Sequence, residues 1–311
     1  MSKEKPTKIR GVIPALLTPF NEDETIDEEK LADLVEFLVG KGVNGFYING
    51  STGEGILMSP AERKRVAEIV IKKVDKRVPV IVHVGTIDTR TAVDLARHAY
   101  ENGADMVSSV PPFYYRFSFE EIFGYYRDLA AATPLPVVVY NIPITTGVEI
   151  GASAIRKLAE IEHVTGIKYT SPNTYDIQRI KEIDGGRITV FAGMDEICVP
   201  GLFMGADALI GSTYNLLPEY YLEIVEQYEL GELESARKNL IIANDMVEIM
   251  LRYPQYPALK LAMKWIGVDC GVSRRPFRRL KEAEVKELRD SLLELKQRKG
   301  LVGISLLDAI A

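Results

Sequence analysis

The chain has 311 residues, of which 47% are hydrophobic and 26% are charged, and its formal net charge at pH 7 is −6. These proportions are typical of a globular protein with one large core. The acidic balance argues against a surface dedicated to nucleic acid, because binding a polyanion depends on clustered Lys and Arg side chains. One basic run, from Arg274 to Lys281, departs from this balance. We interpret it as a solvated helix start or a set of surface ion pairs.

The sequence also lacks the usual signals for membrane insertion, disulfides and zinc. Its opening segment is polar and charged, and no stretch of about 18 apolar residues follows, so we expect no secretory signal, no transmembrane helix and a cytoplasmic location. Cys198 and Cys270 are far apart and form no Cys-x-x-Cys motif, which fits a reducing compartment. His83, His98 and His163 have no companion ligands at metal-binding spacing, so we expect no structural zinc.

Short β-branched runs alternate with longer amphipathic stretches along most of the chain. This alternation predicts βα units around a parallel sheet, and the continuously apolar runs are typical of strands covered on both faces. Eight such units predict an α/β fold, a (β/α)8 TIM barrel over residues 1–229. The predicted strands are Gly11–Leu17, Val43–Ile48, Val78–Val84, Met106–Val110, Pro136–Tyr140, Val164–Lys168, Ile188–Ala192 and Ala208–Ile210.

Each predicted strand is followed by a predicted helix. The clearest boundary is Ser59-Pro60-Ala61-Glu62, where Ser caps the helix, Pro takes the first helical position and Glu reaches back as in a capping box. After the eighth unit, apolar residues at helical spacing predict an appended helical layer over residues 230–311, which either covers a flank of the barrel or contacts another subunit. The predicted helices of the barrel begin near Asp27, Ser59, Asp88, Phe119, Gly151, Tyr175, Glu196 and Pro218.

Functional residues of such a barrel lie at the carboxyl ends of its strands. The second strand runs into the glycine-rich turn Gly50–Gly55. The backbone N–H groups of this turn and the hydroxyls of Ser51 and Thr52 can hold a small anion. The alternative is a tight turn whose hydroxyls cap the next helix.

The sixth strand ends at Lys168, which places an amine at the tip of an apolar strand. A desolvated, neutral amine can attack a ketone and form a Schiff base, whereas the alternative is a rim lysine that extends to water. Tyr140 ends the neighbouring fifth strand, and its phenol can transfer protons if a hydrogen bond from Ser51 or Thr52 tunes it. The alternative for Tyr140 is a core tyrosine with a satisfied hydroxyl.

Polar residues also follow the last two strands. The seventh strand leads through Gly193 to Asp195 and Glu196, and the eighth leads to Ser212. Paired carboxylates can accept hydrogen bonds from several sugar hydroxyls, whereas the alternative makes Asp195 a helix N-cap and Glu196 a favourable first-turn charge. The convergence of these groups with Lys168 at one end of the barrel favours an active site.

The residues at these strand ends resemble those of the dihydrodipicolinate synthase and N-acetylneuraminate lyase superfamily. The resemblance runs from about Ile9 to Pro276, nearly the whole chain. Its motifs are Gly50-Ser51-Thr52-Gly53-Glu54, His83-Val84-Gly85, Pro112-Phe113-Tyr114-Tyr115, Tyr140-Asn141-Ile142-Pro143, Gly166-Ile167-Lys168 and Gly211-Ser212-Thr213-Tyr214-Asn215.

The resemblance implies a lysine-dependent pyruvate aldolase that needs no metal or organic cofactor. Lys168 would form the Schiff base with pyruvate, Tyr140 would relay protons, and Ser51 with Thr52 would hold the pyruvate carboxylate. A homotetramer is implied as well, in which Tyr114 reaches across a subunit interface toward the neighbouring site. The alternative for Tyr114 is an aromatic interface contact. The implied partners are small molecules, pyruvate and a sugar aldehyde, with no nucleic acid and no membrane.

Within the superfamily, three positions bear on the substrate. The synthases usually carry an arginine two residues after the proline of the Tyr-Asn-x-Pro segment, and Thr145 stands there in this chain. Like the lyases, the chain has Thr170 two residues after Lys168, and it has the lyases' Asp-Glu pair and Gly-Ser-Thr-Tyr-Asn run. The implied reaction is reversible cleavage of N-acetylneuraminate to N-acetylmannosamine and pyruvate. The implied sugar-binding residues are Thr170, Gly193, Asp195, Glu196 and Ser212.

Three alternatives to this reaction stay open. The first is dihydrodipicolinate synthase activity, and the second is cleavage of a different 2-keto-3-deoxy sugar acid. Specificity for a sugar acid depends on pocket shape and on a few hydrogen bonds, which residue types alone do not give. The third alternative is a catalytically inactive barrel that serves as a binding or scaffold protein.

Overall fold

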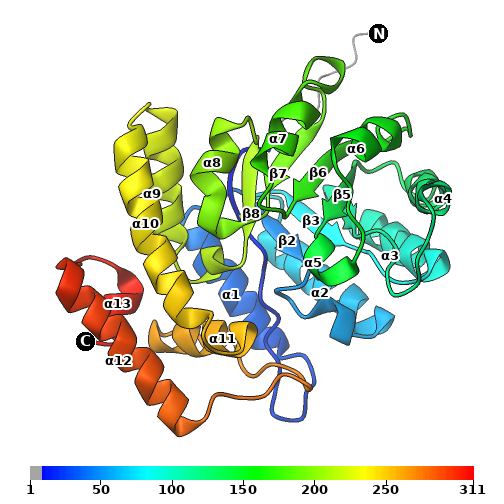
Figure 1. Cartoon of the computed structure of the whole chain (residues 1–311). Coiled ribbons are helices and arrows are strands. Elements are labelled where there is room, and N and C mark those ends of the chain that lie inside the picture. The colour runs from blue at the N-terminus through cyan, green and yellow to red at the C-terminus, as the bar shows by residue number, and fades with distance from the viewer. Residues whose placement is uncertain (1–8) are drawn as a thin grey trace.

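In the computed structural model, which describes residues 9–311, eight parallel strands form a barrel that helices surround (Figure 1). Neighbouring strands follow the order β1-β8-β7-β6-β5-β4-β3-β2. A bridge between Ala15 and Tyr47 closes the barrel between its first two strands. The predicted (β/α)8 fold is therefore confirmed. The strands are β1 (Gly11–Pro14), β2 (Phe46–Ile48), β3 (Val80–His83), β4 (Met106–Ser109), β5 (Val137–Asn141), β6 (Val164–Tyr169), β7 (Thr189–Ala192) and β8 (Ala208–Gly211).

Helices connect successive strands and cover the outside of the barrel (Figure 1). Each predicted helix start lies at or beside an observed one; Glu196 falls in the short turn η3 (Asp195–Ile197), which continues into a helix. The short helix α5 (Pro143–Thr146) was not predicted. The remaining helices of the barrel are α1 (Glu28–Gly40), α2 (Pro60–Val74), α3 (Thr89–Glu101), α4 (Phe119–Ala131), α6 (Ala152–Leu158), α7 (Thr174–Lys181), α8 (Cys198–Phe203) and α9 (Pro218–Glu229), with turns η1 (Gly55–Leu57), η2 (Ile183–Gly185) and η4 (Thr213–Asn215).

Capping residues explain where these helices begin. The Ser59 hydroxyl accepts a hydrogen bond from the Glu62 N–H, and the Glu62 carboxylate accepts one from the Ser59 N–H at 2.8 Å, so the predicted capping box is confirmed. The Asp27 and Asp88 carboxylates accept hydrogen bonds from the Lys30 and Thr91 N–H groups at the starts of α1 and α3. Each cap satisfies a backbone donor that the first helical turn leaves unpaired, and this sets the point where the chain leaves the preceding loop.

Four further helices follow the barrel: α10 (Leu233–Met250), α11 (Gln255–Trp265), α12 (Glu282–Lys299) and α13 (Ser305–Ala309). The buried side of α10 belongs to the same hydrophobic core as α9, and α12 lies along α10 (Figure 1). Leu306 and Leu307 of the terminal segment are fully buried in that core. This packing agrees with the first of the two roles left open for this layer, that it covers a flank of the barrel, and contact with another subunit stays a prediction. The division at residue 229 stays a prediction, because one core continues across it.

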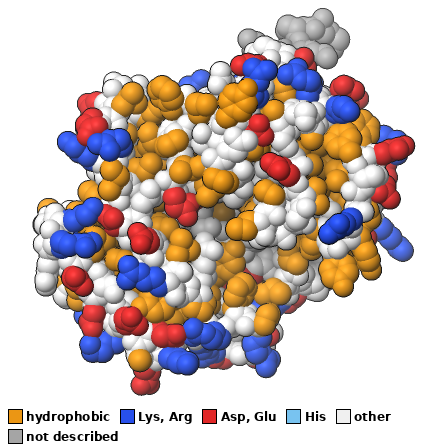
Figure 2. Space-filling model, viewed as in Figure 1, with side chains coloured by type: hydrophobic (Ala, Val, Ile, Leu, Met, Phe, Trp, Pro, Cys, Tyr) orange, Lys and Arg blue, Asp and Glu red, His pale blue; other side chains and the backbone are white. Residues whose placement is uncertain are grey.

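The basic run from Arg274 to Lys281 is not uniform. Arg274 is only 8% exposed, so the surface interpretation is wrong for this residue. Acidic and basic side chains lie side by side along the lower edge of the molecule, where this segment passes (Figures 1 and 2). The surface interpretation is confirmed for the ion pairs Arg275–Glu24, Arg278–Glu284 and Arg279–Glu22.

A membrane-spanning helix and a secretory signal are both expected to be absent, and the described residues bear mainly on the first. From residue 9 onward, no helix combines the length and the apolar composition needed to cross a membrane. The opening segment, in which we expect no secretory signal, lies mostly outside the described residues.

Asn215 links the first and last strands of the barrel at their carboxyl ends. Its side-chain oxygen accepts a hydrogen bond from the Leu17 N–H at 3.2 Å, and its amide nitrogen donates to the Ala15 and Ser212 carbonyls at 2.7 and 2.8 Å. The residue is fully buried. These bonds therefore hold the segment after β1 against the turn after β8.

We expect Asn215→Ala to lower the free energy of unfolding by about 3 kcal/mol, because it leaves buried backbone groups without partners. Urea unfolding followed by circular dichroism measures this change. The control is Asn102→Ala, which removes an exposed side chain bonded to the His98 carbonyl and is expected to change stability by less than about 0.5 kcal/mol. Equal losses in the two variants would contradict the role of Asn215.

Candidate active site

Lys168 and Tyr140 lie side by side at the carboxyl ends of β6 and β5, where their Cα atoms are register partners. The Lys168 side chain points into the barrel and the residue is 4% exposed. Its Nζ lies 4.1 Å from the centroid of the Tyr47 ring and 4.3 Å from that of the Tyr140 ring. Among the residues that the structure describes, no carboxylate pairs with this amine. The interpretation of Lys168 as a rim lysine in water is therefore wrong.

Tyr47 is a member of this group that we did not predict. Its hydroxyl is 3.1 Å from the Ser108 hydroxyl, and its ring meets the Tyr140 ring edge-on at 5.8 Å. Burial raises the pKa of Tyr47 well above its usual value, so the phenol stays protonated and the ring stays a neutral wall beside the amine. Tyr47 was missed because it stands inside a continuously apolar strand. Its neighbours Phe46 and Ile48 pack in the outer core, whereas Tyr47 packs with the residues that fill the barrel.

Tyr140 is packed against His83 as well as Tyr47. The His83 ring meets it edge-on at 5.9 Å, and burial beside Arg63 lowers the pKa of His83 well below its usual value, so this ring is neutral. The predicted hydrogen bond from a hydroxyl of the Gly50–Gly55 turn to Tyr140 is not formed within residues 9–311. The Thr52 hydroxyl instead lies 2.7 Å from the Ser212 hydroxyl.

The Gly50–Gly55 turn is closed by its own backbone. The Glu54 N–H donates to the Ser51 carbonyl and the Gly55 N–H donates to the Gly50 carbonyl, both at 3.0 Å. Thr52 is buried and Ser51 is partly exposed. Neither hydroxyl caps α2, since Ser59 does, so the capping interpretation is wrong for this turn. The hydroxyls of Ser51 and Thr52, and the turn's N–H groups other than those of Glu54 and Gly55, are thus left near the strand ends to contact a ligand.

Asp195 braces the last two strands. Its Oδ2 accepts hydrogen bonds from the Thr213 N–H at 2.8 Å and the Thr213 hydroxyl at 2.6 Å. Burial raises the pKa of Asp195 to about 6, although these bonds act in the opposite direction. The N-cap interpretation is wrong, because η3 begins after Met194 without a side-chain cap. The neighbouring Glu196 is in the first turn of η3 and partly exposed, which agrees with its interpretation as a first-turn charge.

Thr170 and Gly193 follow β6 and β7 and touch each other. A Cβ atom at Gly193 would overlap the Thr170 hydroxyl, so only glycine fits beside this threonine. The Thr170 hydroxyl is buried and has no hydrogen-bond partner among the described residues. A buried hydroxyl of this kind costs free energy unless a ligand group satisfies it. Together with Asp195 and Ser212, these residues lie around the same end of the barrel as Lys168.

Tyr114 does not join the Lys168 group. It is 83% exposed, lies between β4 and α4, and meets the Tyr115 ring edge-on at 5.1 Å. Its backbone φ of 82° is in the left-handed region, which is unusual for an aromatic residue. Within the chain, the structure thus brings together every predicted catalytic and sugar-binding residue except Tyr114 around the carboxyl end of the barrel.

A model of the dihydrodipicolinate synthetase family matches residues 8–295. The chain belongs to this family. It is 37% identical over 288 residues to the N-acetylneuraminate lyase of Rhizobium meliloti (strain 1021), covering 92% of this chain and 95% of that protein.

Solved structures agree with this assignment. A catalytic lysine mutant of the sialic acid aldolase of Ruminococcus gnavus superposes on this family member with a TM-score of 0.89 at 31% identity, over 94% of this chain and 97% of that one. A dihydrodipicolinate synthase superposes with a TM-score of 0.85 at 30% identity, over 94% of this chain and 100% of that one. Similarity in fold therefore extends to both branches of the family.

The raised pKa of Asp195 predicts a pH-dependent contribution to stability. The folded state holds a proton on this carboxyl up to about pH 6, whereas the ordinary value is 3.8, so this contribution is present at low pH and is lost as pH rises through about 6. Asn keeps an oxygen for Thr213 and does not titrate. We therefore compare the free energy of unfolding of Asp195→Asn with that of the unmodified chain at two pH values. The difference should favour the variant more at about pH 7 than at about pH 4, by on the order of 2 kcal/mol. Urea unfolding at both pH values measures it, and a difference independent of pH would count against this assignment.

Proposed function

We propose that the chain is a class I aldolase that cleaves N-acetylneuraminate reversibly to N-acetylmannosamine and pyruvate. The observation that carries this proposal is the Lys168 amine, buried between the Tyr47 and Tyr140 rings at the carboxyl end of the barrel. A relative named as a sialic acid aldolase is described with a catalytic lysine, and a curated relative is named N-acetylneuraminate lyase. Both names agree with a lysine-dependent reaction on a sialic acid.

In the first step, the Lys168 amine attacks the C2 ketone of the open-chain sugar acid, and loss of water leaves an iminium ion. The electron-rich faces of Tyr47 and Tyr140 stabilise a cation at this position as they stabilise the ammonium form, since Nζ lies over both rings. The carboxylate of the same substrate is held by Ser51 and Thr52, whose turn offers hydroxyls and N–H groups.

In the second step, Tyr140, which has given its phenol proton to the hydroxyl lost as water in the first step, accepts the proton of the C4 hydroxyl while the C3–C4 bond breaks. The electron pair of the C3–C4 bond moves into the iminium, so the aldehyde N-acetylmannosamine leaves and an enamine remains on Lys168. Tyr140 returns this proton to C3, which restores the iminium. Water then hydrolyses the iminium to pyruvate and the free amine, and the proton that this water releases restores the Tyr140 phenol. Tyr140 suits this role because it is the register partner of Lys168 on the neighbouring strand.

The remaining polar residues hold the sugar chain. The Thr170 hydroxyl has no protein partner, so a substrate hydroxyl can satisfy it. Glu196 is partly exposed and accepts from sugar hydroxyls, while Gly193 leaves room beside Thr170. In this arrangement Asp195 and Ser212 contribute at the wall of the site, where each already bonds a neighbouring residue.

The first test compares pyruvate release from N-acetylneuraminate by the unmodified chain and by Lys168→Arg, which keeps the charge but forms no stable imine. We expect a loss of at least about 10⁴-fold. Lys181→Arg is the control, because Lys181 pairs with Asp207 away from the site and should release pyruvate at the unmodified rate.

The outcomes separate the alternatives. No release by the unmodified chain, with pyruvate-dependent borohydride labelling of Lys168 retained, would move the assignment to dihydrodipicolinate synthase activity or another 2-keto-3-deoxy sugar acid. Absence of both release and labelling would leave a binding or scaffold protein.

The active form is proposed to be a cytoplasmic homotetramer. Tyr114 and Tyr115 are 83% and 65% exposed, and Ile144 beside the site is 90% exposed, so this part of the surface is apolar enough for a subunit contact. In such a contact Tyr114 would approach the neighbouring site and complete its proton relay. Both cysteines are buried free thiols, which agrees with a reducing compartment.

Sedimentation velocity tests the assembly. We expect the unmodified chain to sediment as a tetramer and Tyr114→Asp to dissociate into smaller species, because a charge buried at an interface costs free energy. Arg127→Asp is the control, at an exposed position of α4. A monomer for the unmodified chain would exclude any role for Tyr114 across an interface.

A further inference from the structure

Glu54, the last residue of the Gly-Ser-Thr-Gly-Glu motif, has no part in the proposed reaction. Its backbone is left-handed, with φ of 56°, and its side chain is fully buried. Oε1 accepts a hydrogen bond from Lys260 Nζ at 2.7 Å, and Oε2 accepts one from the Arg274 N–H at 2.8 Å. Both partners come from the C-terminal helical layer, more than two hundred residues away in sequence.

The Lys260 ammonium group has a hydrogen-bond acceptor for each of its three protons. Its Nζ also donates to the Thr18 and Val272 carbonyls, each at 2.7 Å, so three acceptors surround the ammonium group. The side chain is 2% exposed, and Nζ lies 4.7 Å from the centroid of the Phe20 ring. The amine of α11 is therefore fixed in position by the end of β1 as well as by Glu54.

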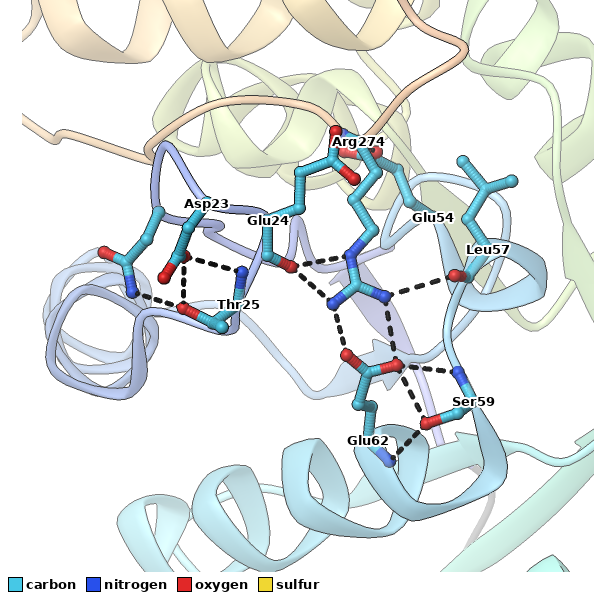
Figure 3. A network of polar contacts seen from close by, with 9 residues as sticks. Asp23, Glu24, Thr25, Glu54, Leu57, Ser59, Glu62 and Arg274 are labelled. Carbon is cyan, nitrogen blue, oxygen red and sulfur yellow. Dashed lines mark hydrogen bonds and ion pairs between the residues drawn. The ribbon is translucent and has the colours of Figure 1, made fainter.

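Arg274 holds the chain on the other side of Glu54 (Figure 3). Its guanidinium donates to the Leu57 carbonyl at 3.1 Å and to both oxygens of Glu62, which completes the capping box of α2. It also donates to the Glu24 carbonyl and lies over the Phe20 ring at 4.3 Å. The segment from the hydroxyl turn to the first turn of α2 is thus bound at three points.

Stability alone is a weak reason for this arrangement. Burying an ion pair removes two charges from water, and an apolar group of similar size often stabilises a core as well or better. The pair instead fixes the orientation of the Glu54 carboxylate, because each of its oxygens accepts a hydrogen bond from a different segment. The Glu54 N–H in turn closes the turn onto the Ser51 carbonyl, directly beside Thr52.

We propose that Glu54 is a positioning residue of the proposed aldolase, and the inference rests on that proposed function. With Lys260 and Arg274, it fixes the turn that presents Ser51 and Thr52 to the carboxylate of pyruvate. Through Lys260 and Arg274, the segment of residues 255–274 is on this account a part of the active site, although the proposed reaction uses neither side chain.

The test is borohydride trapping of pyruvate, in which the labelled fraction of the Lys168 peptide is measured by mass spectrometry against pyruvate concentration. In Glu54→Gln the amide nitrogen faces one of the two donors, so one bond is lost and the turn is less well fixed. We expect the half-labelling concentration to rise about tenfold, with full labelling still reached at saturating pyruvate because Lys168 is intact.

The matched control is Asp207→Asn. It removes the charge from another partly buried ion pair, with Lys181 at 2.6 Å, at the amino end of β8 and thus at the opposite end of the barrel. Both variants should lower the thermal unfolding temperature. Only Glu54→Gln should change the half-labelling concentration, which a purely structural role would leave unmoved.

Arg274→Lys is a second variant in case Glu54→Gln does not fold. It keeps the bonds of Glu54 but loses the forked contacts to Glu62 and Leu57, and we expect a rise of about threefold. If the variants fold and are half-labelled at the same pyruvate concentration as the unmodified chain, the inference is overturned while the proposed function stands. An unmodified chain that pyruvate does not label would overturn the proposed function, and the inference with it.

Discussion

The placement of one amine, that of Lys168, in the barrel interior constrains the rest of the structure. A buried amine without a carboxylate partner is costly, and here Nζ lies over the faces of Tyr47 and Tyr140. A carboxylate beside Lys168 would hold the amine as an ion pair and prevent its attack on a ketone. Asp195, a buried acid at the same end of the barrel, instead accepts hydrogen bonds from Thr213. The reactivity of the amine therefore depends on keeping negative charge away from it.

The loops around this amine are joined to one another by side-chain hydrogen bonds. Thr52 and Ser212 bond across the top of the barrel, and Asn215 ties the turn after β8 to the end of β1. Because a closed barrel brings its first and last strands together, residues from both ends of the sequence form one wall. A site with groups fixed in this way meets its substrate already in the required geometry, which lowers the cost of organising it during the reaction.

Much of the fold and part of the site could be predicted from local pattern. The capping box at Ser59 and the apolar strand that ends at Lys168 are complete within a few residues, so their signals are strong. Tyr47 could not be told from core residues, because which side of a strand faces the barrel centre depends on how the barrel closes. Arg274 was assigned to the surface for a related reason. Its partners Glu24, Leu57 and Glu62 are more than two hundred residues away, and neighbours in sequence carry no trace of them.

The same argument explains why the C-terminal layer belongs with the site. Local pattern describes α11 only as an amphipathic helix, and a helix that covers a flank needs apolar residues on that side alone. Lys260 is a charged residue on that buried side. It is almost completely buried and forms three hydrogen bonds in the interior. An apolar residue at that position would cover the flank at lower cost, but it would not orient Glu54. The buried charge is thus best explained by the geometry it imposes on the turn that carries Ser51 and Thr52.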